Sequence, residues 1–151
     1  MRTIQLKLRD VEDQDCQDIY DWRTHPLVCQ NSFNSAAFSY ADHEAWFQRK
    51  RQSPETTIYI AFCDDQKVGV VRFEDEKQSV NVSVMLNPQF IGQGLGGKLI
   101  ELGVKRLKEQ KQSQKPIIAE IKEDNFASIK AFEKAGFKKS HVTYVFKSGS
   151  L

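Results

Sequence analysis

The stretch Asn87-Pro-Gln-Phe-Ile-Gly-Gln-Gly-Leu-Gly-Gly-Lys98 places four glycines between a predicted strand over residues 80–86 and an amphipathic helix predicted from about Gly94 to Gln110. Glycines let the backbone adopt positive φ and approach a ligand closely. The first N–H groups of a helix have no partner within it and lie at the positive end of its dipole. The pattern therefore favours an anion such as a pyrophosphate at the start of this helix.

Other glycine-rich loops bind phosphates too, and this one differs from them. A Walker loop requires Ser or Thr after its Gly-Lys pair, but Leu99 follows Lys98. A dinucleotide-binding fingerprint requires an early βαβ unit with an acidic residue about 20 positions further on. This loop instead follows three predicted strands late in the chain. A tight turn that binds no ligand is the remaining alternative.

The region before the glycine loop predicts a strand and a helix. Residues 3–8 alternate polar and apolar side chains as a strand does. Asp10 is expected to cap a helix that runs to about Arg23. His-Pro ends that helix, and residues 27–38 show no clear period, which predicts a loop or a short helix.

A second helix is predicted where Ser39 and Asp42 have the spacing of a capping box, and it extends to about Gln52. Another helix is expected over 125–135, closed by the left-handed C′ residue Gly136. The strands are predicted at residues 57–62, 67–73, 80–86, 117–121 and 142–146. The order βα(α)βββαβαβ predicts one α/β (α+β) domain over 1–151, with a mixed, mostly antiparallel sheet flanked by helices.

Composition narrows the class of protein. The 151 residues are 40% hydrophobic and 28% charged, which is typical of a globular domain. A net charge of +2 without strong clustering argues against nucleic acid as a partner. We expect a cytoplasmic location and no membrane partner, because the alternating start lacks the apolar run of a signal peptide. Three separated cysteines predict neither disulfides nor a metal site, and the protein is expected to be a monomer or homodimer.

The glycine loop resembles the acetyl-coenzyme A loop of the GNAT superfamily of N-acetyltransferases. Asn125-Phe-Ala-Ser-Ile-Lys-Ala-Phe-Glu-Lys-Ala-Gly-Phe137 resembles the motif that follows it in that family, about 33 residues further on. The resemblance implies acetyl-coenzyme A as cosubstrate and no metal. It implies cofactor-binding roles for Val84, Met85 and Leu86 beside the pantetheine arm, for Ile91, Gly92, Gln93, Gly94, Leu95, Gly96, Gly97 and Lys98 at the pyrophosphate, and for Asn125, Ser128 and Phe132 along the arm.

Two positions depart from the family pattern. Ile91 stands where the family usually has Arg or Gln, which removes one side-chain contact but leaves the backbone amides. Phe132 stands where many members have a Tyr that protonates the leaving thiolate. Coenzyme binding is expected to survive both changes. The general acid is left unassigned, since water or another residue can protonate a thiolate whose thiol has a pKa near 8.5.

A narrower resemblance concerns the acceptor. The segments around Trp22-Arg-Thr-His-Pro26, Asn31-Ser-Phe-Asn34 and His43-Glu-Ala-Trp-Phe47 are similar to those of N-acetyltransferases that modify UDP-linked 4-amino-sugars, a small-molecule acceptor class. A nucleotide sugar requires cations for its diphosphate and aromatic and polar groups for the rest. The candidate substrate-binding residues are Trp22, Arg23, His25, Asn31, Asn34, Trp46 and Arg72.

The expected reaction is direct attack of a neutral amine on the thioester in a ternary complex. The strand over 80–86 contains no carboxylate, so His43 is the first candidate for the catalytic base and Glu120 the second. Three alternatives stay open. The acceptor could be a protein N-terminus, the domain could hold coenzyme A without catalysis, and the acyl group could differ from acetyl.

Overall fold

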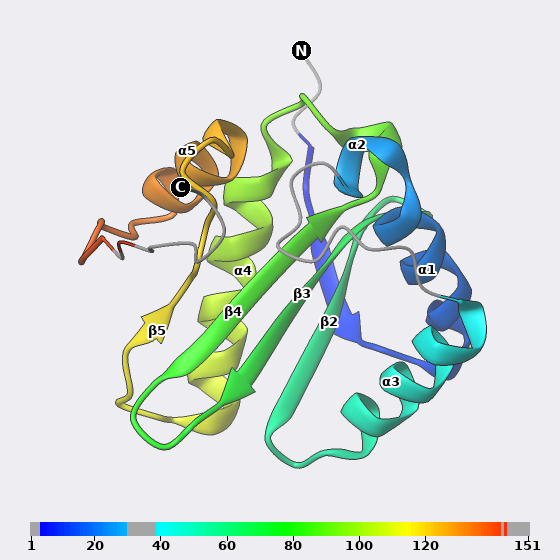
Figure 1. Ribbon diagram of the computed structural model, residues 1–151, viewed down its shortest axis with the longest axis horizontal. Coiled ribbons are helices and arrows are strands. Elements are labelled where there is room, and N and C mark those ends of the chain that lie inside the picture. Colours follow the sequence, from blue (N-terminus) through cyan, green and yellow to red (C-terminus); the bar gives the residue numbers. More distant parts are fainter. Residues whose placement is uncertain (1–3, 30–38, 143, 145–151) are drawn as a thin grey trace, which may run out of the picture.

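Five strands form one sheet in the computed structural model, which describes residues 4–29, 39–142 and 144 (Figure 1). The order is β1-β2-β3-β4-β5, antiparallel from β1 to β4 and parallel between β4 and β5. This confirms the predicted mixed, mostly antiparallel sheet. The strands span Lys7–Asp10 (β1), Thr56–Cys63 (β2), Gln66–Asp75 (β3), Val80–Leu86 (β4) and Ile117–Ile118 (β5). Most of the strand predicted at 142–146 lies outside the described residues.

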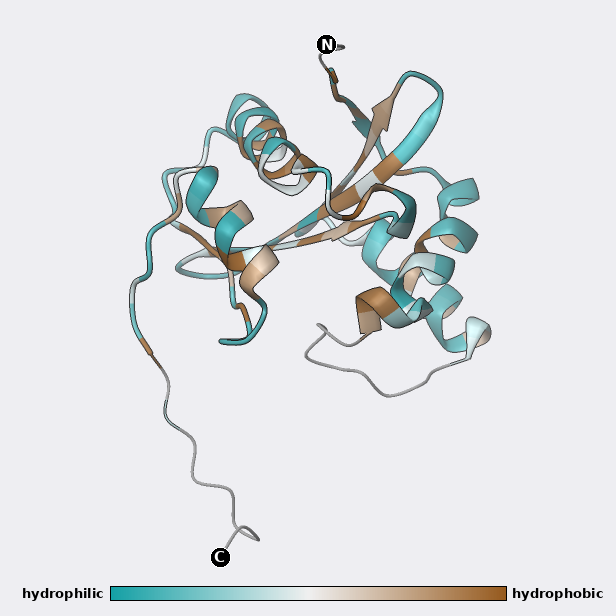
Figure 2. Ribbon diagram, turned by 90° about the horizontal axis from the view of Figure 1, so that it is seen from above, coloured by the Kyte–Doolittle hydropathy of each residue, from teal (hydrophilic) through white to brown (hydrophobic). Residues whose placement is uncertain are grey.

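Helices cover both faces of the sheet (Figures 1 and 2). Because strand side chains alternate, Val71, Phe73 and Val82 pack on one face, and Ile60 and Val70 pack on the other. The first face is covered by α4 and α5, and the second by α1 and α3. The helices span Cys16–Thr24 (α1), Pro26–Cys29 (α2), Tyr40–Gln52 (α3), Leu95–Lys111 (α4) and Phe126–Lys134 (α5).

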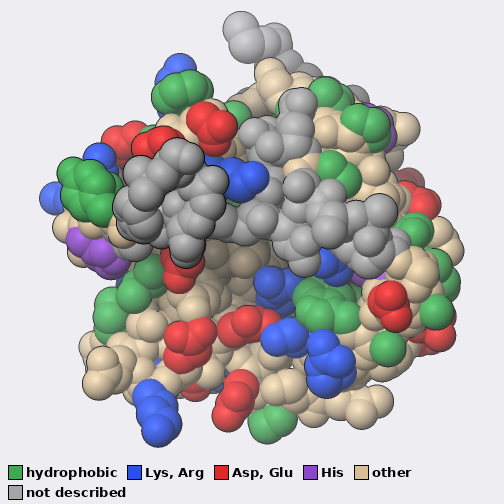
Figure 3. All heavy atoms as spheres, in the orientation of Figure 1, with side chains coloured by type: hydrophobic (Ala, Val, Ile, Leu, Met, Phe, Trp, Pro, Cys, Tyr) green, Lys and Arg blue, Asp and Glu red, His purple; other side chains and the backbone are tan. Residues whose placement is uncertain are grey.

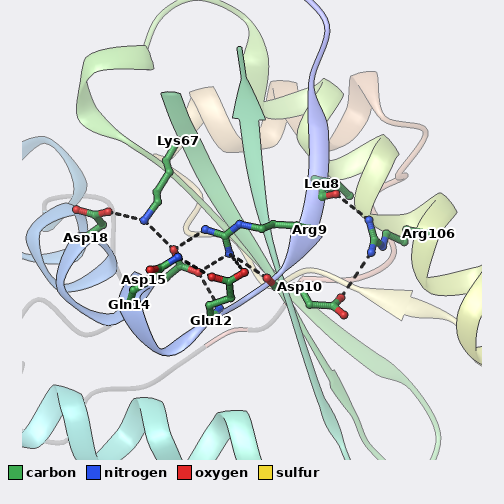
Figure 4. A network of polar contacts seen from close by, with 9 residues as sticks. All are labelled: Leu8, Arg9, Asp10, Glu12, Gln14, Asp15, Asp18, Lys67 and Arg106. Atoms are coloured by element: carbon green, nitrogen blue, oxygen red, sulfur yellow. Dashed lines mark hydrogen bonds and ion pairs between the residues drawn. The ribbon is translucent and has the colours of Figure 1, made fainter. Parts of the chain in front are cut away.

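The start of α1 differs from the prediction. Asp10 is the last residue of β1 and caps no helix, and a 3-10 turn over Asp13–Asp15 precedes α1. The Asp15 side chain is 0% exposed and accepts hydrogen bonds from the Glu12 N–H at 2.7 Å and from Arg9 at 2.7 and 2.9 Å (Figure 4). A fully buried carboxylate requires such partners, so the chain makes this turn before the helix begins.

The start of α3 and the end of α5 have the caps that the sequence predicted. Ser39 caps α3 by accepting from the Asp42 N–H at 3.1 Å. At the end of α5, Gly136 has φ of +99°, and the Phe137 N–H donates to the Phe132 carbonyl at 2.9 Å. This bond and the contact between the two phenyl rings, whose centroids are 5.1 Å apart, are the features of a Schellman motif.

The end of the sheet at β5 gives the fold its open side. The strand predicted over 117–121 is only Ile117–Ile118, and it pairs with β4 at Val80 and Asn81 alone. Beyond Asn81, β4 continues to Leu86, and the two strands diverge (Figure 1). The second half of β4 thus has a strand partner in β3 but none on the β5 side among the described residues.

Candidate active site

The open edge of β4 presents backbone groups at alternate residues. The Asn87 N–H donates to the Val68 carbonyl at 2.8 Å, and this pair continues the register in which Gly69 lies opposite Leu86. Hydrogen-bonded pairs in an antiparallel ladder recur every second residue. Met85 therefore directs its N–H and C=O toward β3, while Val84 and Leu86 direct theirs toward the open side. An extended ligand can pair with these two residues as an added strand would.

The loop after β4 connects that edge to α4. Asn87 fixes its start, because its amide donates to the Lys67 carbonyl at 2.9 Å and its Oδ1 accepts from the Gln89 N–H at 3.1 Å. Gly92 and Gly94 have φ of +88° and +73°, and a Cβ on either would meet no protein atom within 4 Å. Glycine is required at both positions by the backbone conformation, and the space beside them is open.

The first turn of α4 is suited to an anion. Gly94 is its N-cap, and no side chain caps the helix. The N–H groups that follow belong to Leu95, Gly96 and Gly97, with the exposed side chain of Lys98 beside them. Free N–H groups at the positive end of a 17-residue helix bind phosphate groups without further side chains.

Gly96 and Gly97 have a second role that the sequence did not reveal. A Cβ on Gly96 would lie 3.2 Å from Cβ of Ala131, and one on Gly97 would lie 3.3 Å from the Ala131 carbonyl oxygen. These two glycines let α4 and α5 pack closely. Leu95 is also structural in its side chain, which is buried in the core. Only the backbone of these three residues could therefore contact a ligand at the helix start.

Three further predicted coenzyme residues lie on or before α5. Asn125 is its N-cap and accepts from the Ser128 N–H at 3.2 Å. Phe132 is 4% exposed and packs in the core against Phe137. Two other predicted coenzyme residues, Ile91 and Gln93, lie in the loop before α4 and have exposed side chains. The side chain at position 132 offers no proton donor, and its burial makes it a part of the helix packing.

Three of the predicted acceptor residues, Arg23, Trp46 and Arg72, meet on the opposite face of the sheet. Trp46 of α3 lies between contributions from α1 and β3, since Cζ of Arg23 is 4.8 Å and Cζ of Arg72 is 5.0 Å from its ring centroid. Basic side chains gather beside a hydrophobic one on this face, with acidic ones alongside (Figure 3). Burial and then repulsion from Arg72 lower the pKa of Arg23. We call Arg23, Trp46 and Arg72 the arginine–tryptophan cluster.

Arg72 forms an ion pair with Glu74, which lies on the same strand. Its Nε lies 3.6 Å from Glu74 Oε1, and Lys50 of α3 contacts the same oxygen at 2.5 Å. Arg72 Nη2 lies 3.5 Å from Ser83 Oγ. Because Arg72 and Ser83 are directly opposite in the β3–β4 register, the cluster lies next to Val84, where the open edge of β4 begins.

The geometry corrects the assignment of His43 as the base. His43 is 1% exposed, its Nε2 lies 3.0 Å from the Cys16 carbonyl oxygen, and its Nδ1 lies 3.3 Å from Arg23 Nη1. A carbonyl only accepts and a guanidinium only donates, so Nε2 carries the proton and Nδ1 accepts. Burial and the Arg23 charge lower the pKa of His43, although the hydrogen bond to Cys16 opposes them. Both nitrogens are thus engaged away from an incoming amine.

Of the other predicted acceptor residues, one is buried, one is exposed and two lie outside the described residues. Trp22 is 6% exposed and packs in the core beneath α1, which corrects its assignment to the substrate. His25 is exposed and its Nδ1 accepts from the Leu27 N–H at 3.1 Å, which stabilises the turn into α2. Asn31 and Asn34 lie outside the described residues.

Glu120 remains available as a candidate base. Ile117, Ala119 and Ile121 pack against the core on the α4 side. Glu120 lies between two of these core-packed residues, and its side chain is exposed. It lies two residues beyond the end of β5, where the pairing of β5 with β4 has ended.

The described part of the chain shows neither a metal centre nor a membrane-spanning helix. Residues 4–29, 39–142 and 144 contain no group of three or more His, Cys, Asp or Glu side chains placed to hold a metal ion. Within the same residues, no helix combines the length and the apolar character needed to span a bilayer.

Comparison with known proteins places this architecture among acetyltransferases. The family profile described as acetyltransferase (GNAT) domain matches residues 5–138. An uncharacterized protein of Methanocaldococcus jannaschii is 26% identical over 137 residues, which are 88% of this chain but only 28% of that protein. The chain thus spans less than a third of this relative.

Two solved structures share the fold. The spermidine N-acetyltransferase of Vibrio cholerae, in complex with coenzyme A and spermine, has a TM-score of 0.82 at 17% identity, covering 95% of this chain and 87% of that one. The aminoglycoside acetyltransferase AAC(6')-Ib, in complex with coenzyme A, has a TM-score of 0.78 at 21% identity, covering 90% and 86%.

Proposed function

The chain belongs to the GNAT acetyltransferase family, and from this premise we propose that it is an acetyl-coenzyme A-dependent N-acetyltransferase whose acceptor is a small anionic amine. The observation that carries the proposal is the open edge of β4, which leads directly into the uncapped first turn of α4. We further propose the 4-amino group of a UDP-linked amino-deoxysugar as the acceptor.

The residues present fit the cosubstrate by the chemistry of their backbone. The outward N–H and C=O groups of Val84 and Leu86 match the amides of a pantetheine arm. The N–H groups of Leu95, Gly96 and Gly97 match a pyrophosphate, with Lys98 adding positive charge. The bound coenzyme would supply the acetyl thioester, and the Val84 N–H would stabilise negative charge on its carbonyl oxygen.

Besides binding the cosubstrate, the site must position a neutral amine and accept its proton. The arginine–tryptophan cluster adjoins Val84 through the Arg72–Ser83 pair, so an acceptor held there lies beside the open edge. Glu120 is the proposed base, acting directly or through water, because it is exposed and follows β5 at the open side of β4. With Phe132 buried and lacking a hydroxyl, we assign protonation of the leaving thiolate to water.

The charge of the cluster favours an anionic acceptor. Spermidine and aminoglycosides, after which the two structurally similar enzymes are named, carry several ammonium groups at neutral pH. Two guanidinium groups on one tryptophan repel such polycations, while they can bind the oxygens of a diphosphate in bidentate fashion. This supports a nucleotide sugar over a polyamine.

The test is thiol release from acetyl-coenzyme A with UDP-4-amino-sugars, N-terminal peptides, spermidine and an aminoglycoside, alongside a binding titration with coenzyme A. We expect turnover with the amino-sugars and none with the polycations. Turnover of peptides alone would favour a protein N-terminal acetyltransferase. Coenzyme binding without turnover of any amine would identify a non-catalytic coenzyme-binding domain.

A further inference from the structure

His43 is a buried polar side chain on the acceptor face, and each of its ring nitrogens makes a hydrogen bond of fixed direction. Since it cannot reach an amine, its contacts must serve another purpose. We propose that His43 is a positioning residue, whose neutral imidazole holds the Arg23 guanidinium against Trp46 so that the acceptor meets a preorganised cation. This inference rests on the proposed function only in its kinetic part.

The first support is the chain of hydrogen bonds. The His43 Nε2–H donates to the Cys16 carbonyl at the start of α1, and Nδ1 accepts from Arg23 in the last turn of the same helix. One imidazole on α3 therefore spans both ends of α1. Its ring is also fixed by neighbours, with the Tyr20 centroid at 5.2 Å and the Trp46 centroid at 5.7 Å.

The second support is the repulsion that the arrangement must overcome. Arg23 and Arg72 both contact Trp46, and the charge of Arg72 disfavours the charged state of Arg23. Arg72 is restrained by Glu74 on its own strand. A hydrogen-bond acceptor at Nδ1 keeps Arg23 in place against this repulsion. A protonated imidazole could not accept, so the neutral form is the one that positions Arg23.

Two substitutions separate this role from a general structural one. In His43→Asn the side-chain oxygen can replace Nδ1 as the acceptor for Arg23, but the bond to Cys16 is lost. In His43→Gln the amide N–H can replace Nε2 toward Cys16, but the acceptor for Arg23 is lost. We expect His43→Gln to raise the acceptor KM about tenfold, and His43→Asn to raise it by no more than about twofold. The Kd of coenzyme A should stay unchanged in both.

A second measurement needs no acceptor and so stays informative if the proposed function fails. In a Trp22→Phe background the fluorescence reports on Trp46 alone, and the Arg23 guanidinium shields its ring. We expect His43→Gln, but not His43→Asn, to increase quenching of Trp46 by acrylamide. Equal KM values for the two variants, or equal quenching in variants that remain folded by circular dichroism, would overturn the positioning role.

Discussion

The coenzyme side and the acceptor side of the site are built from different parts of the chain. The coenzyme side consists of backbone groups from one continuous stretch, β4 followed by the loop and the first turn of α4. The acceptor side consists of side chains from α1, α3 and β3, which are held by one another. Changes in backbone conformation should therefore damage the first side, and changes in charge should damage the second.

The largest effect is expected at Gly94, where the coenzyme side depends on backbone alone. Gly94→Val places a β-branched side chain at φ of +73°, a conformation that such residues very rarely adopt. The loop must then rearrange, and binding of coenzyme A should fall below detection in a calorimetric titration. Gly94→Asn is the matched control, because Asn tolerates positive φ. If Gly94→Val bound coenzyme A as the parent does, the loop would not be the pyrophosphate site.

The next effect tests whether the two sides meet at Glu120. Glu120→Gln should lower kcat by about 100-fold while the Kd of coenzyme A stays unchanged, since a general base contributes about 10²- to 10⁴-fold. Glu123→Gln, another exposed carboxylate on the same segment, should leave kcat unaltered. Equal rates for both variants would remove Glu120 as the base.

The contrast between the two sides also explains which features of the structure the sequence predicted correctly. Glycine spacing and apolar periodicity determine local backbone conformation, so the range of β4, the start of α4 and the Gly136 cap were all predicted correctly. The burial of Trp22 and the engaged nitrogens of His43 depend on packing between distant segments. No local pattern carries that information, and a tryptophan beside an arginine looks the same whether it faces a ligand or the core.

An ion cluster around the buried Asp15 links the start of α1 to β1 and β3 (Figure 4). Asp15 accepts from Arg9 and contacts Lys67 at 2.7 Å, and the Lys67 carbonyl in turn accepts from Asn87 at the start of the coenzyme loop. Burial raises the pKa of Asp15, but the hydrogen bonds from Arg9, Lys67 and the Glu12 N–H outweigh it and lower the pKa to about 2.

The depressed pKa makes a prediction about acid stability. The Asp15 contribution is present above the unfolded pKa near 4 and is lost as the pH falls through about 2, which amounts to about 2 kcal/mol. Urea titrations at pH 6 and pH 2.5 should show a smaller loss of unfolding free energy in Asp15→Asn, which starts less stable, than in the parent. A parallel loss in both proteins would show that other carboxylates govern acid unfolding.

The smallest effect is expected at Arg72, where the acceptor side depends on charge. Arg72→Ala should raise the acceptor KM about tenfold, the cost of about one charge-assisted hydrogen bond, while the Kd of coenzyme A changes little. The increase should shrink at high salt, because ions screen a partly exposed guanidinium. Arg49→Ala is the matched control, because it removes an exposed arginine from α3, the helix that carries Trp46. If Arg72→Ala weakened coenzyme binding and left the acceptor KM unchanged, Arg72 would belong to the coenzyme side, and the division into a backbone-built and a charge-built half would fail at this residue.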